Sequence, residues 1–209
     1  MEEQLNQIRA WLKTGSINIF GLPLSGKDTV GQKLAESLGA QFLSSGSILR
    51  NSADLSKLSK SVVDATNEGN LTPTDDFERI VLPYFARPEF AGSALILSSI
   101  GRWSGEESSV MQALEQANHP LRAVIVLNIS ENTVLERWEA AKILGDRDGR
   151  ADDRSEQILK RRLDEFNTKT LPVIMRYQEL GLLVPVNGNQ PRPDVISEVI
   201  EKLAKFSSL

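Results

Sequence analysis

The sequence predicts an α/β domain in which helices cover both faces of a parallel sheet. From residue 16 onward, short apolar stretches typical of strands alternate with longer stretches whose apolar residues recur at helical spacing. The most apolar strand, residues 121–129, contains the unbroken run Val124 to Leu127, and such a run indicates burial on both faces of a parallel sheet. At 209 residues the chain can bury a sizeable core, so we expect one domain with an insertion.

A glycine-bounded loop after the first strand predicts a phosphate-binding site. The strand ends at Gly21, and Gly26-Lys27 opens a helix, which matches the P-loop spacing Gly-x-x-x-x-Gly-Lys. Backbone N–H groups at the helix start would meet anionic oxygens, Gly26 lets the backbone approach closely, and Lys27 adds positive charge. Asp28 follows where Ser or Thr is expected, and Thr29 comes one position late. The alternative is a simple turn with Lys27 in solvent.

The other elements follow from apolar spacing and from turn residues. Further strands are expected at residues 40–43, 94–97 and 182–186. Helices are expected at residues 2–13, 26–38, 53–68, 74–86, 106–117, 133–142, 155–180 and 194–205. Pro172 should kink or break the long helical region that contains it. Residues 145–154 form a polar, charged loop.

Composition narrows the classes of partner. The chain is 40% hydrophobic and 25% charged with a net charge of −4, which argues against general nucleic-acid binding. It contains no cysteine, hence no disulfide and no thiolate zinc site, which fits a reducing compartment. The first residues lack the basic and apolar regions typical of a signal peptide, and no apolar stretch in the sequence is long enough to span a bilayer. We therefore expect a cytoplasmic protein without nucleic-acid or membrane partners, and we expect a monomer.

Several motifs in order, from about residue 16 to 203, resemble the adenylate kinase family of nucleoside monophosphate kinases. The loop of residues 21–29 resembles the family's Gly-x-Pro-Gly-x-Gly-Lys-Gly-Thr, with Leu24 and Asp28 where glycines usually stand. Residues 45–50 resemble Thr-Gly-Asp-x-Leu-Arg, residues 69–73 the Gly-x-Leu-Val-Pro turn beside the acceptor base, and residues 98–102 the Asp-Gly-Phe-Pro-Arg segment. Residues 149–153 resemble Arg-x-Asp-Asp, residues 162–163 Arg-Leu, and residues 187–190 the turn beside the donor adenine.

This resemblance implies a P-loop NTPase fold with a five-stranded parallel sheet and helices on both faces. It implies one kinase domain over residues 1–209, with an acceptor-binding part at about 44–73, a short lid at about 143–152 and an extra helix at 1–14. The implied reaction transfers the γ-phosphate of Mg-bound ATP to a nucleoside monophosphate, with AMP as the first choice. A kinase for CMP, UMP or GMP is the alternative enzyme. A degenerate nucleotide-binding regulatory module is the alternative of another class. It is motivated by Ser98 and Leu24, which depart from the family pattern, and by Ala141, which stands where the family has a second lid arginine.

The resemblance also implies the roles of individual residues. Catalysis is expected from one lysine and four arginines: Lys27, Arg102, Arg137, Arg150 and Arg162. ATP is expected at Gly21, Leu24, Ser25, Gly26, Lys27, Asp28, Thr29, Arg137 and Gln190. The monophosphate is expected at Ser45, Arg50, Leu71, Thr72, Arg102, Glu106, Arg150 and Arg162. Arginine suits these tasks because its planar fork grips phosphate at two points and stays charged. Arg162 is preferred over Arg161 because its spacing to Leu163 and Pro172 fits the family pattern.

Two departures from the family pattern carry separate hypotheses. Ser98 stands where the family has an Asp that orients water on Mg²⁺, and Asp28 introduces a carboxylate beside Lys27. Since Mg²⁺ keeps several waters and needs few carboxylates, Asp28 could take over that contact to magnesium-bound water; no direct protein ligand of the metal is expected. Alternatively, Asp28 points outward and only favours the helix N-terminus.

The second departure is Glu106, which stands where the family has a Gln that reads adenine. A carboxylate only accepts hydrogen bonds, so it would match the N–H edges of guanine or cytosine better than adenine N1. The alternative is that Glu106 begins a helix beside Glu107 and faces solvent.

Overall fold

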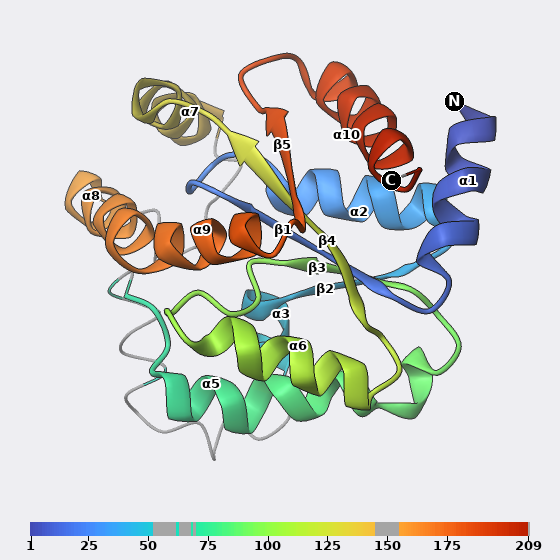
Figure 1. The fold of residues 1–209 in the computed structure, drawn as a ribbon. Helices are drawn as coiled ribbons and strands as arrows, with labels where there is room; N and C mark the ends of the chain where they lie inside the picture. The colour runs from blue at the N-terminus through green and yellow to red at the C-terminus, as the bar shows by residue number, and fades with distance from the viewer. Residues whose placement is uncertain (52–61, 63–67, 69, 145–154, 209) are drawn as a thin grey trace.

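A five-stranded sheet forms the centre of the protein (Figure 1). The computed structural model describes residues 1–51, 62, 68, 70–144 and 155–208. The strands are β1 (Ser16–Gly21), β2 (Gln41–Ser44), β3 (Leu95–Ser98), β4 (Leu121–Asn128) and β5 (Leu183–Asn187). They run in the order β2-β3-β1-β4-β5, and every pair is parallel. The predicted parallel α/β fold is confirmed, and all five strands end at the same edge of the sheet.

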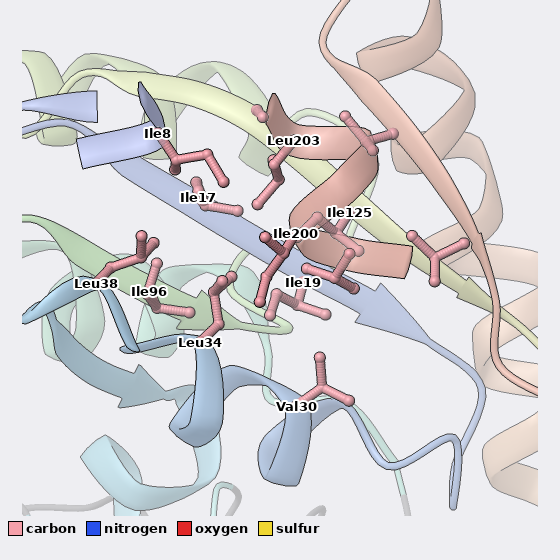
Figure 2. Close-up of a cluster of buried hydrophobic side chains, with 14 of the residues drawn as sticks. Ile8, Ile17, Ile19, Val30, Leu34, Leu38, Ile96, Ile125, Ile200 and Leu203 are labelled. Carbon is pink, nitrogen blue, oxygen red and sulfur yellow. The ribbon is translucent and has the colours of Figure 1, made fainter. Parts of the chain in front are cut away.

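The first face of the sheet is covered by α1 (Glu2–Leu12), α2 (Lys27–Leu38) and α10 (Arg192–Phe206). Figure 2 shows their apolar side chains directed at those of the strands, with Ile8, Leu34 and Leu203 around Ile17 and Ile19. Ile17 and Ile19 of β1 both point to this face, whereas Phe20 points to the other, because successive side chains of a strand point to opposite faces of the sheet. The helix expected at residues 2–13 packs onto this core through Leu5, Ile8 and Leu12. Gln7 Nε2 of α1 also donates to the Ala204 carbonyl of α10 at 2.8 Å.

The second face is covered by α5 (Thr74–Val81), α6 (Glu106–Gln116) and α9 (Leu171–Glu179) (Figure 1). Phe77 and Val110 pack with Leu95 and Leu97 in one buried cluster. A second cluster joins Phe20 to Tyr177 and its neighbours on α9. The other described α-helices are α3 (Ser45–Asn51), α7 (Glu131–Leu144) and α8 (Glu156–Glu165), and there are two 3₁₀ turns, η1 (Leu82–Ala86) and η2 (Pro88–Phe90).

Prolines and a wide turn divide two of the expected helices. The helix expected at 74–86 ends as α5 at Val81 and continues as the 3₁₀ turn η1, where Pro83 removes a backbone donor. The region expected at 155–180 consists of α8, a π-helical turn η4 (Phe166–Thr170) and α9. The Leu171 N–H reaches back to the Phe166 carbonyl, and such wide turns are frequent at functional sites. The backbone stays helical from Glu156 to Glu179, and its irregular part is the π-helical turn just before Pro172.

Most of the expected helix at 53–68 and all of the loop at 145–154 lie outside the described residues. Among the described helices, none combines the length and the apolar character that crossing a membrane requires.

Candidate active site

The loop between β1 and α2 contains two residues in the left-handed backbone region. Gly26 has a φ of 87° and Leu24 a φ of 62°. A Cβ on Gly26 would meet no atom within 4 Å, so glycine is needed there for the backbone conformation rather than for space. A positive φ is unusual for leucine, and the packing of Leu24 against Val134 and Trp138 offsets that strain.

Gly21 allows the loop to close on itself. A Cβ at this position would lie 2.7 Å from Ser25 Oγ and 3.0 Å from the Leu127 carbonyl oxygen. Ser25 is buried, and its hydroxyl has no hydrogen-bond partner among the described residues. The closed loop turns the N-terminus of α2, and with it Lys27, toward the edge where the strands end.

Arg137 of α7 holds this loop from outside. Its Nη1 donates to the carbonyl oxygens of Leu24 and Ser25 at 3.1 and 3.2 Å, and its Nη2 donates to the Gly188 carbonyl at 2.7 Å. Burial lowers the pKa of Arg137, and nearby Arg192 lowers it further. The guanidinium therefore connects the loop of residues 22–26, called the phosphate loop below, to the turn after β5. That turn is the segment expected beside the donor adenine.

Asp28 meets Ser98 across the sheet edge. Ser98 Oγ at the end of β3 donates to Asp28 Oδ1 at 2.6 Å. Both residues line the same cavity. Asp28 is thus directed to the end of the neighbouring strand, and the alternative in which it points outward does not describe this structure.

A cavity of about 620 Å³ opens beside these residues. Its wall on the side of the phosphate loop includes the expected ATP residues Gly21, Leu24, Gly26, Lys27, Asp28 and Thr29. Its lining also includes the expected acceptor residues Ser45, Leu71, Thr72, Arg102 and Arg162. Three cationic side chains from distant parts of the chain, Lys27, Arg102 and Arg162, therefore share one cavity.

The cavity does not include every residue that the sequence suggested. Ser25, Glu106, Arg137 and Gln190 lie outside its lining. Gln190 donates from Nε2 to a carboxylate oxygen of Glu198 on α10. Arg150 lies outside the described residues, as does the side chain of Arg50.

The backbone around Arg102 is held by two buried polar side chains that the sequence analysis did not assign to this task. Asn18 of β1 donates from Nδ2 to the Ile100 carbonyl at 2.7 Å and accepts from the Ile100 N–H at 3.3 Å. Glu106 Oε2 accepts from the N–H groups of Arg102 and Trp103 at 2.7 and 3.0 Å. Asn18 could have been noticed in the sequence, because it is a polar residue in an otherwise apolar strand. For Glu106, no local signal distinguishes this role from the alternatives.

The pKa of Arg102 is shifted by its burial and by the charged side chains around it. Burial in the cavity wall lowers its pKa to about 10, and nearby Arg162 acts in the same direction. The carboxylates of Glu106, Glu165 and Asp28 act in the opposite direction. The guanidinium remains charged at neutral pH, in a site where an anion would relieve the repulsion between the two arginines.

Glu106 is buried, with only 2% of its surface exposed, so the solvent-facing alternative is wrong. Its Oε1 accepts from the Thr74 hydroxyl at 2.9 Å, in addition to the two backbone donors at Oε2. Burial raises its pKa, while these hydrogen bonds and the charge of Arg102 act to lower it.

Arg161 and Arg162 point to different places although they are adjacent on α8. Arg162 lines the cavity. Arg161 is exposed, and its Nη1 lies 3.4 Å from the Glu68 carbonyl oxygen and 3.7 Å from Glu68 Oε2. The geometry thus places the residue chosen from its spacing, rather than its neighbour, at the cavity.

Glu165 and the π-helical turn contribute cavity residues that the sequence analysis missed. Glu165, Phe166 and Thr170 all line the cavity. Thr170 is buried, and its hydroxyl has no partner among the described residues. The signal for Glu165 was its position three residues after Arg162, on the same helical face.

Comparisons with known proteins agree with this geometry. The adenylate kinase family model matches residues 19–182. The chain belongs to the adenylate kinase family. Adenylate kinase from Streptococcus pyogenes serotype M49 (strain NZ131) is 27% identical over 212 residues, covering 90% of this chain and 98% of that protein. Adenylate kinase from Streptococcus thermophilus (strain CNRZ 1066) is 27% identical over 215 residues, covering 89% and 97%.

A solved structure supports the fold of this adenylate kinase family member. A gluconokinase from Sinorhizobium meliloti 1021 matches with a TM-score of 0.64 over 93% of this chain and 94% of that chain, at 18% identity. At this identity the similarity concerns the fold alone, and it is consistent with the P-loop NTPase fold predicted from the sequence. Family membership makes the chain a kinase that transfers phosphate to a nucleoside monophosphate.

Proposed function

We propose that the protein transfers the γ-phosphate of Mg-bound ATP to AMP and forms two molecules of ADP. The observation that carries this proposal is the single cavity that Lys27 shares with Arg102 and Arg162. Phosphoryl transfer requires a protein mainly to align two anions and to neutralise their charge. Three cations around one cavity, in a member of the adenylate kinase family, suit that requirement.

On the donor side, the phosphate loop would bind ATP. The N-terminus of α2 offers backbone donors and the positive end of the helix dipole to the phosphates. Lys27 would accompany the transferred phosphoryl group. Arg137 already donates to three backbone carbonyls, so its role would be to hold the loop and the turn at Gly188 in place for the donor nucleotide.

On the acceptor side, Arg102 and Arg162 would hold the phosphate of the monophosphate and the group in transfer. The turn at Leu71 and Thr72, together with Ser45, lines the part of the cavity in which the acceptor would bind. Arg50 and Arg150 are proposed to join them. Phe166 adds an apolar wall, which would help to exclude water and so prevent wasteful hydrolysis of ATP.

The residues present fit a magnesium ion that arrives with the nucleotide. Asp28 and Ser98 offer oxygen atoms at the cavity wall, which is the chemistry that Mg²⁺ prefers. Within the described parts of the chain, no three His, Cys, Asp or Glu side chains are grouped as a metal cage. We propose that Asp28 accepts from water bound to the ion. When bound, the ion would neutralise phosphate charge.

The test is ADP formation from ATP with AMP, CMP, UMP or GMP, with Lys27→Met as the blank. We expect the highest kcat/KM with AMP, and a loss of about 100-fold or more in the blank. A higher kcat/KM with one of the other monophosphates would favour the alternative kinase. ATP binding by calorimetry without turnover above the blank would favour a regulatory module. The monomeric state and the cytoplasmic location remain predictions.

A further inference from the structure

The segment that carries Arg102 is anchored to the acceptor side of the cavity by a buried carboxylate. Glu106 receives three hydrogen bonds: two from the backbone of Arg102 and Trp103, and one from the Thr74 hydroxyl. Thr74 begins α5, directly after the turn that lines the cavity at Leu71 and Thr72. One carboxylate therefore joins the phosphate-facing arginine to the element that follows the acceptor turn.

A second set of contacts connects the same two segments. Trp103 Nε1 donates to the Thr72 carbonyl at 3.0 Å, and the Leu71 N–H donates to Glu165 Oε2 at 3.1 Å. Lys169 closes the set, because its Nζ lies 2.5 Å from Glu165 Oε1 and 3.9 Å from the centre of the Trp103 ring. These contacts hold the acceptor turn against both the arginine segment and the π-helical turn.

The position of Glu106 bears on whether it can read a base. Both carboxylate oxygens already accept hydrogen bonds, the side chain is 2% exposed, and Glu106 is absent from the cavity lining. Withdrawing the carboxylate from these donors would leave partly buried N–H groups without this acceptor, which is costly. Arg102, whose backbone Glu106 holds, does line the cavity.

We propose that Glu106 is a positioning residue: it orients Arg102 toward the acceptor phosphate and does not select the base. This proposal rests on the proposed function for the identity of the acceptor. It replaces the hypothesis that Glu106 favours guanine or cytosine. A fault in positioning weakens binding of every monophosphate by the same factor, because all of them carry the same phosphate.

Three variants separate positioning from base reading. Glu106→Gln keeps an oxygen for the two backbone donors, and its amide can donate to the Thr74 hydroxyl. Glu106→Ala removes all three contacts. Thr74→Val is the matched control, because it removes one contact to Glu106 without touching the backbone of Arg102. Each is assayed with AMP, CMP, UMP and GMP at saturating Mg-ATP, and with varied Mg-ATP at a saturating monophosphate. Thermal unfolding checks that each is folded.

We expect Glu106→Gln and Thr74→Val to retain the wild-type order of the monophosphates, with KM changed by about threefold or less. We expect Glu106→Ala to raise KM for all four by a common factor of about tenfold or more, while KM for ATP changes by about twofold or less. A Glu106→Gln enzyme whose ratio of AMP to GMP or CMP efficiency shifts by about tenfold or more would overturn the proposal, since that is the signature of base reading.

An NMR measurement on the folded protein provides a readout that does not depend on turnover. The Nε–H signal of Arg102, assigned by its loss in Arg102→Lys, should shift and broaden in Glu106→Ala. It should stay near its wild-type position in Glu106→Gln and Thr74→Val. An unchanged signal in folded Glu106→Ala would overturn the positioning role. If the wild type turns over none of the four monophosphates, the proposed function fails, and this measurement still tests the positioning.

Discussion

Ser98 at the end of β3 donates a hydrogen bond of 2.6 Å to Asp28 in the first turn of α2, although the two residues are 70 positions apart. Relative to the family pattern, the carboxylate expected at the strand end is absent, and one has been added just after the phosphate loop. The hydrogen bond brings this carboxylate to the end of β3, so the two departures are coupled in space.

The first prediction concerns this pair and magnesium. Asp28→Asn keeps the shape and an acceptor for Ser98 but removes the charge. Because charge-assisted hydrogen bonds contribute about 1.5–3 kcal/mol, the increase in ATP affinity caused by Mg²⁺ should shrink by about tenfold or more. Calorimetric titration with ATP, in the presence and absence of Mg²⁺, measures this ratio.

The double variant Asp28→Gly, Ser98→Asp is the matched rescue, because it restores the arrangement that the family pattern has. It should regain most of the Mg²⁺ effect, whereas Asp28→Gly alone should not. Mn²⁺ bound in the presence of ATP, detected by electron paramagnetic resonance, gives a second readout. A Mg²⁺ effect that is equal in wild type and Asp28→Asn would show that Asp28 plays no part in holding the ion.

The second prediction uses the adjacent arginines of α8 as a pair. Arg162→Ala should lower kcat/KM for the monophosphate by about 100-fold or more, because it would remove a cation from the cavity in which we propose that phosphate is transferred. Arg161→Ala should change it by about threefold or less, since the contacts of Arg161 with the described residues are exposed ones to Glu68. Steady-state kinetics of both variants test which of the two arginines acts at the cavity. A larger loss in Arg161→Ala than in Arg162→Ala would contradict the choice of Arg162.

The third prediction concerns Arg137 and the phosphate loop. Arg137→Lys can retain the charge but not all three hydrogen bonds to Leu24, Ser25 and Gly188, because lysine lacks the planar fork. We expect KM for ATP to rise by about tenfold, with KM for the monophosphate little changed. Arg176→Lys is the control, because Arg176 pairs with Glu179 on the exposed side of α9. Equal effects on both substrates would argue for a general loss of structure.

The fourth prediction concerns Tyr177 and alkaline stability. Burial raises the pKa of Tyr177, and the nearby Glu107 and Glu106 raise it further. The folded protein therefore keeps this proton above pH 10 or so, where the unfolded chain releases it, and the free energy of unfolding falls as pH rises through that range. Tyr177→Phe should remove the decrease in the free energy of unfolding that this tyrosine causes at alkaline pH, which is up to about 1.4 kcal/mol per pH unit.

At neutral pH, Tyr177→Phe should leave stability unchanged or slightly increased, because the buried hydroxyl has no hydrogen-bond partner among the described residues. Urea unfolding of wild type and variant between pH 7 and 11 measures both effects. Parallel stability curves across the alkaline range would show that the hydroxyl is not held in its neutral form by the fold.

Much of the fold could be predicted from residues close together in the chain. The apolar run at Val124 to Leu127 predicted a strand buried on both faces, and it became part of β4 in the interior of the parallel sheet. The glycine spacing of Gly21 and Gly26 predicted a tight loop between a strand and a helix. These signals are readable because apolar periodicity and backbone conformation depend mainly on neighbouring residues.

The sequence predicted the directions of individual side chains less well than it predicted the strands and helices. The sequence left Asp28 either inward or outward, and it left Glu106 either at the base or in solvent. The fold supplied partners for both from distant segments, Ser98 for Asp28 and Thr74 for Glu106. The wide turn that brings Phe166 and Thr170 to the cavity also carried no clear local signal, because helix propensity does not distinguish a π-helical turn from an α-helix.

By itself, the amino-acid sequence determined the alternation of strands and helices, the loop at Lys27 and the set of arginines available for binding anions. The spacing favoured Arg162 over Arg161, but only the tertiary structure brought Arg162 into one cavity with Lys27 and Arg102 and buried Glu106 outside the lining of that cavity. The physical reason is that secondary structure arises from contacts within a few residues. The direction of a charged side chain instead depends on which distant donor, acceptor or solvent the packed elements present to it.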